Sequence, residues 1–221
     1  MAEKQEKRRK RPRWRRRLVV AALVMLAGLF GLYSVQRWVL HNFHEVVPGQ
    51  VYRSAQPGPE QLRQWMQRYG IRTVVNLRSD VDRDAVREEI KAAEKLGLKY
   101  VSVSLWKHHL PTRDKMRELI DAIEAAERPM LLHCRAGADR SGVASVMADM
   151  AIGGANYDSA RKQLSMRYLH FDPYADHVSG VLKVYESYCE GKGIGTGGWQ
   201  QFRNWALNVY GVSPAQPTTM P

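Results

Sequence analysis

The sequence predicts an α/β fold in which helices flank a central, mostly parallel sheet on both faces, preceded by one N-terminal transmembrane helix. Two observations carry this prediction. Between residues 41 and 133, short apolar runs typical of buried strands alternate with amphipathic helical patterns, and helical patterns dominate afterwards. Ahead of them, residues 18–35 form an apolar stretch without a charged side chain, directly after a strongly basic segment.

The basic segment explains most of the charge of the chain. Residues 1–17 hold ten Lys or Arg against two Glu, and the whole chain of 221 residues has a net charge of +12. The charge is therefore weak support for a nucleic-acid-binding domain, and we expect no nucleic-acid partner. The 18 residues of 18–35 are near the short end of the ~17–25 that span a bilayer.

The same segment predicts an orientation. Basic residues accumulate on the cytoplasmic side of membrane helices. We therefore expect a cytoplasmic tail over 1–17, a single-pass anchor over 18–35 in the inner (cytoplasmic) membrane, and a domain over 41–190 on the periplasmic side. A cleaved signal peptide is the alternative. No convincing small-x-small cleavage site follows the apolar core, so an uncleaved anchor is favoured.

Hydrophobic periodicity and the positions of Gly and Pro place the elements up to residue 105. Residues 42–57 are predicted to form a short strand pair, because Pro48-Gly49 and Pro57-Gly58 mark turns. A helix starts at Pro59, since apolar side chains recur at i, i+3, i+4 and i+7, and Gly70 ends it. The elements that follow are a buried strand at 73–77, a polar loop at 78–84, a helix at 84–96 and a strand at 99–105.

Helices make up most of the remaining chain. Thr112 is the expected N-cap of an amphipathic helix that runs to Glu127, and Pro129 then introduces the next strand. The helix after that strand ends at Gly153-Gly154, and further helices are predicted at 156–168 and 175–190. Residues 191–221 form a Gly-rich linker, a terminal helix over 199–210 and a tail. That helix is expected to pack back on the domain, with membrane or partner contact as the alternatives.

The strongest chemical pattern lies at 130–142, where an apolar strand leads to Cys134, then five residues, then Arg140 and a helix start of small residues. A phosphate monoester carries about two negative charges near neutral pH. A short loop that enters a helix N-terminus can bind it, because the first N–H groups are unpaired and lie at the positive end of the dipole. The expected phosphate-binding groups are the N–H groups of Arg135, Ala136, Gly137, Ala138, Asp139 and Arg140, with the Arg140 fork on two phosphate oxygens.

Cys134 is the predicted nucleophile. A free thiol titrates near pH ~8.5, but its pKa falls to roughly 3.5–7.5 at a helix N-terminus beside cations. The alternative is a small buried side chain that merely ends a strand. The other cysteine, Cys189, is expected to be a free thiol, because pairing would block the nucleophile. Arg78 follows a buried strand and is a substrate-binding candidate, with a surface ion pair to Asp80 or Asp82 as the alternative.

The spacing Cys-x5-Arg, with His133 before the cysteine and Ser141 after the arginine, resembles the signature of the cysteine-dependent protein tyrosine and dual-specificity phosphatases. The segment Tyr-Arg-Ser-Ala-Gln-Pro at 52–57 resembles the entry of the bacterial secreted members of that superfamily. The resemblance covers 42–190. It implies that His133 fixes the loop through hydrogen bonds, and that Ser141 stabilises Cys134 as the leaving group in the second step.

The proton donor departs from the pattern of that superfamily. The related phosphatases take an aspartate from the loop after the 99–105 strand, and this sequence has none between Tyr100 and Arg113. Asp139, inside the cradle, is the preferred candidate, as in the bacterial phosphatases with Gly-x-Asp-Arg loops that it resembles. The alternatives are that Asp139 caps the following helix, or that Asp114 is the acid.

The expected activity is metal-independent phosphomonoester hydrolysis through a cysteinyl-phosphate, with no metal and no cofactor. The resemblance favours a protein tyrosine or dual-specificity phosphatase that acts on a phosphorylated protein. A phospholipid or inositol phosphate is the alternative substrate, because the anchor holds the site near a membrane. Two other classes stay open. One is a rhodanese-type sulfurtransferase, whose cysteine loop is usually a residue shorter, and the other is a membrane-tethered phospho-binding module, which would need no nucleophile.

Overall fold

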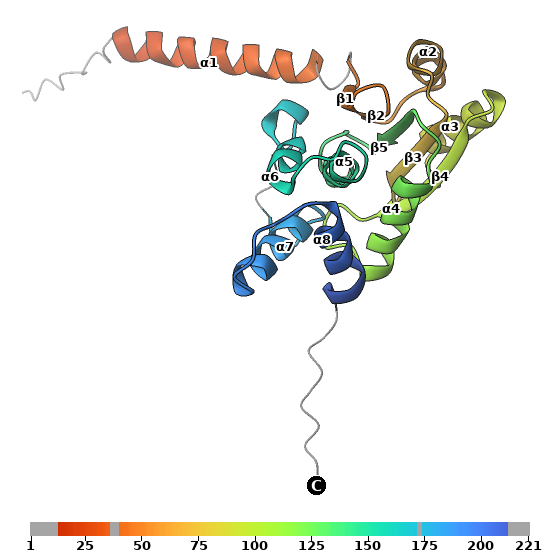
Figure 1. Cartoon of the computed structure of the whole chain (residues 1–221). Coiled ribbons are helices and arrows are strands. Elements are labelled where there is room, and N and C mark those ends of the chain that lie inside the picture. Colours follow the sequence, from red (N-terminus) through yellow and green to blue (C-terminus); the bar gives the residue numbers. More distant parts are fainter. Residues whose placement is uncertain (1–12, 36–39, 172–173, 212–221) are drawn as a thin grey trace, which may run out of the picture.

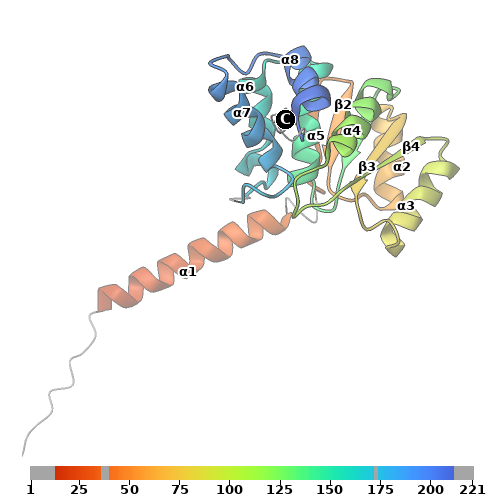
Figure 2. The same cartoon turned by 90° about the horizontal axis from the view of Figure 1, so that it is seen from below.

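The computed structural model describes residues 13–35, 40–171 and 174–211. The first described element is the helix α1 (Arg13–Ser34), which stands apart from the rest of the molecule in both views (Figure 1, Figure 2). Its apolar side chains are exposed. By length and composition, Arg17–Ser34 could cross a membrane. Most of the predicted basic tail lies outside the described residues.

A five-stranded sheet forms the centre of the domain, in the order β1-β2-β5-β3-β4. The pairs β2–β5, β5–β3 and β3–β4 are parallel, and β1 joins the edge antiparallel to β2 as the predicted hairpin. The mostly parallel sheet is thus confirmed. The strands are β1 (His44–Val47), β2 (Val51–Ser54), β3 (Thr73–Arg78), β4 (Lys99–Leu105) and β5 (Met130–His133).

The two faces of the sheet are covered by different helices. Alternate side chains of each strand point to opposite faces, so Val74 and Leu131 join a small cluster with α2 and α3, while Val75 and Leu132 join the larger core with the later helices. The helices of the two layers are α2 (Pro59–Tyr69), α3 (Asp84–Lys95), α4 (Arg113–Ala125), α5 (Asp139–Ala151), α6 (Tyr157–Ala160), α7 (Gly180–Gly191) and α8 (Trp199–Asn204).

Helix α5 runs through the middle of the larger layer. Almost every side chain from Arg140 to Met150 is buried, so it lacks the polar face of a surface helix. It packs on β1, β2 and β5 on one side and on α4, α6 and α8 on the other (Figure 1). The N-terminus of α5 is thereby held firmly against the end of β5.

Several predicted helix ends are confirmed. Gly70 ends α2 in the left-handed conformation with φ 68°, and the Thr112 side chain caps α4 by accepting from the Lys115 N–H at 3.3 Å. The helix predicted at 175–190 starts only at Gly180. A Cβ at Gly180 would lie 1.7 Å from the Ala175 carbonyl oxygen, so the turn before α7 is tighter than a helix that passes through it.

The helix predicted over 156–168 is wrong. The structure has α6 followed by two short 3-10 turns, η2 (Arg161–Gln163) and η3 (Met166–Tyr168). One buried side chain takes a carbonyl that a continuous helix would need, and another fixes the end of the segment. Arg53 donates to the Gln163 carbonyl at 2.6 Å, and Asn42 donates to the Tyr168 carbonyl at 3.0 Å. These tertiary bonds override the helical pattern of the sequence.

The terminal segment packs back on the domain, as expected. Helix α8 continues into the π-helical turn η4 (Trp205–Val209), and Phe202 and Trp205 are buried against α7 aromatic side chains. The Arg113 guanidinium also donates to the Tyr210 carbonyl at 2.7 Å and joins this segment to α4. The segment is therefore part of the core.

We expect Phe202→Ala to lower the free energy of unfolding by about 3–5 kcal/mol, because it removes a fully buried ring from the core. Ile194→Ala is the control, since Ile194 is 46% exposed and should cost little. Urea unfolding of the detergent-solubilised chain measures both. Equal stabilities of the two variants would show that the segment is not docked in solution.

Candidate active site

The cradle, defined here as residues 134–140, starts where β5 ends and closes where α5 begins. The strand β5 lies between β2 and β3, so the cradle sits at the carboxyl edge of the parallel strands, in the middle of the sheet. Ligands of open α/β sheets bind at this edge. Cys134, Ala138 and Arg140 are each less than one-tenth exposed, whereas Arg135 points to solvent.

Gly137 allows the cradle to lie directly on the end of β2. Its φ is 70°, and a Cβ at this position would lie 2.6 Å from the backbone of both Ser54 and Ala55. Both the left-handed conformation and the close approach require glycine. The cradle can therefore take this conformation against β2 only because Gly137 has no Cβ.

Arg53, which the sequence does not identify as a site residue, fixes the cradle from behind. Its side chain is fully buried, and Nη2 donates to the carbonyls of Gly137 at 2.8 Å and Ala138 at 3.1 Å. The guanidinium also lies 4.4 Å from the centre of the Tyr168 ring. Because the carbonyls of Gly137 and Ala138 both accept hydrogen bonds from Arg53, this side chain fixes the conformation of the loop.

Burial of Arg53 lowers its pKa to about 10, and the charge of Cys134 opposes this effect. The guanidinium therefore keeps its charge at neutral pH. Arg53 therefore adds a fixed positive charge beneath the loop. Burying this charge is costly unless an opposite charge or hydrogen-bond acceptors are paired with it.

The electrostatics of the cradle favour a Cys134 thiolate. Burial alone raises the pKa of the Cys134 thiol, but the charge of Arg140, the Ser141 hydroxyl and the backbone N–H groups of Ser141 and Ala136 lower it to about 7. Arg140 is held in place because its Nη1 donates to the Leu105 carbonyl at 3.2 Å. A large fraction of the buried thiol is therefore ionised near neutral pH.

His133 is fixed by a carboxylate from the other layer of the fold. Its Nε2 lies 2.7 Å from Oε1 of Glu89 on α3, and both side chains are fully buried. The second carboxylate oxygen of Glu89 accepts from the Gln56 amide. His133 thus ties the end of β5 to α3, which agrees with the structural role that the resemblance implies.

Asp139 contacts His170 and Lys107, which the sequence does not identify as its partners. Its carboxylate accepts from His170 Nδ1 at 2.9 Å and lies 3.3 Å from Lys107 Nζ. Burial raises the pKa of Asp139, but the His170 hydrogen bond and the Lys107 charge outweigh it, so the pKa is below its usual range. An ionised carboxylate is poorly suited to donate a proton at neutral pH.

The alternative role of Asp139 as the cap of the following helix is not what the structure shows. The N-cap of α5 is Ala138, and no side chain caps this helix. Asp114, the other candidate acid, is exposed in the first turn of α4. The structure therefore groups Asp139, His170 and Lys107 at the cradle, and sequence reasoning identified only the first of these three as a candidate.

Arg78 lies at the same edge, but its guanidinium is already engaged. It binds the Asp80 carboxylate through Nε and Nη2 and donates to the Gln56 Oε1 at 2.9 Å. The hydrogen bond to Arg78 lowers the pKa of Asp80 to about 2. Arg78 and Arg135 line one cleft of about 310 Å³ beside the cradle. Arg78 therefore lines the cleft next to the cradle.

Two other predictions concern thiols and metals. Cys134 and Cys189 are both free and buried. Within the part of the chain that the structure describes, no group of three or more His, Cys, Asp or Glu side chains is placed to hold a metal ion.

Weak signals for the missed residues exist in the sequence. Arg53 is a charged residue in a strand whose four positions are all buried. Glu89 shares a buried helix face with Val86 and Ala93. The hydrophobic periodicity of the strand and of the helix assigns both positions to the core. A charged side chain at such a position is rarely buried without a partner. His170 and Lys107 lie on loops without such a period, so only the structure places them at Asp139.

Comparison with known protein families gives one match to residues 40–174. The matching family is described as a DSP-PTPase phosphatase fused to NAD+ kinase. The match covers more than half of the chain and includes the whole cradle. Among curated proteins, no match to the chain was found.

Solved phosphatase structures share the fold. The active form of Tk-PTP is 21% identical with a TM-score of 0.51, over 66% of this chain and 97% of that one. A putative phosphatase (DUF442) from Shewanella putrefaciens CN-32 is 19% identical with a TM-score of 0.51, over 68% and 93%. PTPMT1 is 16% identical with a TM-score of 0.51, over 68% and 98%. At these identities the likeness shows the fold alone.

The pKa of Cys134 can be tested by alkylation. In a Cys189→Ala background, we expect the rate of reaction with iodoacetamide to rise with pH through a midpoint near 7, because only the thiolate reacts. Replacing Arg140 by Ala removes the largest of the groups that lower this pKa, so the midpoint should move to higher pH. A midpoint that stays near 7 in Arg140→Ala would contradict the assigned cause.

Proposed function

We propose, since this chain belongs to the DSP-PTPase phosphatase family, that it hydrolyses phosphate monoesters without a metal through a cysteinyl-phosphate on Cys134. The single observation that supports this most is the buried Cys134 thiol beside Arg140, the Ser141 hydroxyl and the N–H groups of Ala136 and Ser141, all of which favour its thiolate. A thiolate needs no metal to become a nucleophile. The same loop supplies the donors that a phosphoryl group requires.

In the first step, Cys134 Sγ attacks phosphorus and forms the P–S bond while the P–O bond to the leaving group breaks. Negative charge spreads over the three equatorial oxygens in the transition state. The N–H groups of the cradle and the Arg140 guanidinium bind these oxygens. Because Arg53 and Gly137 hold the loop in advance, little reorganisation is needed at the moment of reaction.

The departing oxygen takes up a proton, and we assign the donor to His170. Asp139 Oδ1 lies 2.9 Å from Nδ1 of this side chain and holds the ring at the cradle. An oriented His is the commonest general acid. Asp139 then acts as a positioning residue. Its general-acid role, which the sequence predicts, is disfavoured by its lowered pKa.

In the second step, a water attacks phosphorus on the side opposite Sγ. The new P–O bond forms, the P–S bond breaks, and Cys134 leaves as a thiolate. The neutral His170 produced in the first step accepts the proton of the water. The Ser141 hydroxyl, which is fully buried and lowers the pKa of Cys134, stabilises the departing sulfur.

Two substrate classes are candidates for this site. The family description favours a dual-specificity phosphatase, which acts on phosphorylated protein side chains. A phospholipid headgroup is the second candidate. PTPMT1, which shares the fold, has been solved in complex with PI(5)P. The apolar helix α1 also supports a substrate at a membrane.

We further propose that α1 is an uncleaved anchor in the inner membrane and that the domain lies on the periplasmic side. The support is the basic segment that precedes the apolar residues of α1. Protease protection of spheroplasts distinguishes this orientation from the reverse one.

The nucleophile is tested by Cys134→Ser with Cys189→Ala as the matched control. We expect hydrolysis of p-nitrophenyl phosphate to fall about a thousandfold or more in Cys134→Ser, because the nucleophile is lost. Activity should persist in Cys189→Ala and in the presence of EDTA. Turnover by Cys134→Ser at the wild-type rate would contradict the mechanism, as would loss of wild-type activity in EDTA.

The proton donor is tested with two leaving groups. We expect His170→Asn to slow phenyl phosphate more than p-nitrophenyl phosphate, because the poorer leaving group depends more on protonation; general acids contribute roughly 10²–10⁴-fold. Asp139→Asn should show the same preference to a smaller degree. An effect on both substrates in equal proportion would exclude His170 as the donor.

A further inference from the structure

We propose that the carboxyl edge of the sheet, with the cradle at its centre, docks on the surface of the membrane that α1 spans, and that the substrate is a phosphomonoester headgroup of a lipid in that membrane. The inference rests on the proposed function and names its substrate class. It is carried by the attachment point of α1, the exposed apolar side chains and the charge of this edge.

The chain that leaves α1 arrives directly at the cradle. The Leu40 N–H donates to the carbonyl of Val35 at 3.0 Å, so the end of the helical segment lies next to Leu40. Two residues later, the Asn42 side chain donates to the Ala136 carbonyl of the cradle at 3.1 Å. The His41 carbonyl also accepts from the Ala55 N–H at 2.7 Å.

These contacts limit the distance between membrane and site. Consecutive residues advance at most ~3.6 Å, so the cradle contact of Asn42 lies within about 15 Å of the end of α1. The 18 residues of Arg17–Ser34 cover a hydrocarbon core at ~1.5 Å per residue. The headgroup layer on each side is roughly 5–8 Å thick. The cradle therefore lies within the headgroup layer or at most about 10 Å above it.

Exposed apolar side chains gather at the same edge. Among the described residues after Leu40, the exposed large apolar side chains at this edge are Val81, Trp106, Leu110, Met166, Phe171 and Tyr174. They belong to the loops after β3 and β4 and to the segment that carries His170. Trp106 is 65% exposed and Phe171 is 80% exposed. Among the residues that the structure describes after Leu40, Val184 and Ile194 are the remaining ones of this kind, and they lie away from the edge. Aromatic side chains of this sort favour the membrane interface.

The loops that bear these side chains are fixed to each other around the cradle. The Val178 N–H donates to the Lys107 carbonyl at 2.9 Å, and the His108 and His177 rings lie 4.7 Å apart. His170, next to Phe171, binds Asp139 of the cradle. Trp106 and Phe171 are therefore carried by loops that both contact the site, and they can enter one surface together.

The charge of the edge also suits a phospholipid surface. Arg83, Arg135 and Arg167 are exposed there, and such side chains are attracted to anionic headgroups. The nearby carboxylates of Asp80 and Asp84 are paired with Arg78 and Arg87. Asp82 and Asp176 are the exposed acids that remain on these loops.

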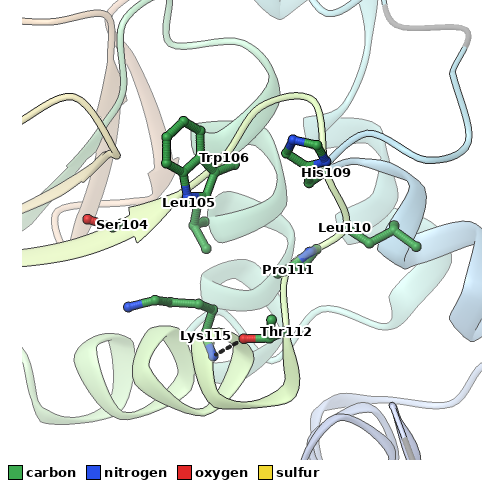
Figure 3. A pocket seen from close by; sticks show the side chains of 8 residues that line it. All are labelled: Ser104, Leu105, Trp106, His109, Leu110, Pro111, Thr112 and Lys115. Atoms are coloured by element: carbon green, nitrogen blue, oxygen red, sulfur yellow. Dashed lines mark hydrogen bonds between the residues drawn. The ribbon is translucent and has the colours of Figure 1, made fainter.

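An apolar pocket lies under the loop that carries Trp106. It has a volume of about 400 Å³ and lies between the loop of Trp106 and Leu110 and the start of α4 (Figure 3). Leu105 lines it, and the carbonyl of the same residue binds Arg140. Apolar surface at this edge thus continues from the exposed Trp106 and Leu110 into the pocket beneath them.

The test compares two double variants of the full chain in lipid nanodiscs of phosphatidylcholine and phosphatidylglycerol that contain PI(5)P. Trp106→Ser/Phe171→Ser removes apolar side chains of the edge, and Val184→Ser/Ile194→Ser is the matched control away from it. We expect the ratio of PI(5)P turnover to p-nitrophenyl phosphate turnover to fall about tenfold in the first variant, because two interfacial anchors are lost. The ratio should stay unchanged in the control.

Three results would overturn the inference while the proposed function stands: an unchanged ratio in the edge variant, an equal loss in both variants, or turnover of phosphotyrosine peptides with none of PI(5)P. If the wild-type chain fails to hydrolyse p-nitrophenyl phosphate, the proposed function itself is wrong. The two failures are therefore distinguishable.

Discussion

The hydrogen bonds from Arg53 to the carbonyls of Gly137 and Ala138 are the constraint on which the site depends. A phosphate-binding loop needs its N–H groups inward, so its carbonyls must find donors on the other side. A fully buried guanidinium in the neighbouring strand supplies these donors and also binds the Gln163 carbonyl. The same side chain thus shapes the cradle and interrupts the helix predicted over 156–168.

The sequence predicted the sheet, most of its helices and the position of the Cys134 loop between a strand and a helix, because these depend on local patterns. Apolar runs, Gly and Pro positions, and the Cys134 to Arg140 spacing are visible without tertiary information. The residues that support the loop, such as Arg53, Glu89 and His170, act through contacts between segments that are distant in the sequence. Hydrophobic periodicity does not reveal which partner such a residue contacts. Glu89 is 44 positions from His133 in the sequence, and His170 is 31 positions from Asp139. The predictions of the start of α7 and of the turns after α6 were wrong for the same reason.

The supporting contacts come from the sheet and from the helical layer of α2 and α3. Glu89 reaches His133 from α3, Arg53 reaches the cradle carbonyls from β2, and the Leu105 carbonyl at the end of β4 holds Arg140. Each contact fixes a different part of the loop. Preorganised donors are effective because they need not reorganise during the reaction, so loss of any one support would loosen the part of the loop that it holds.

The charge balance of the site explains why so polar a group of residues can be buried. Arg53 and Arg140 place two positive charges around a single Cys134 thiolate, and desolvation penalises the charged forms of Arg53 and Cys134. A phosphate dianion in the loop would add the opposite charge where a surplus of positive charge exists, so binding stabilises Arg53 as well as the substrate. The Asp139 carboxylate is paired with His170 and Lys107, and its charge offsets part of this surplus at Arg53. In the proposed mechanism, this carboxylate holds His170 at the cradle, Arg53 supports the loop from behind, and Arg140 binds the phosphoryl group.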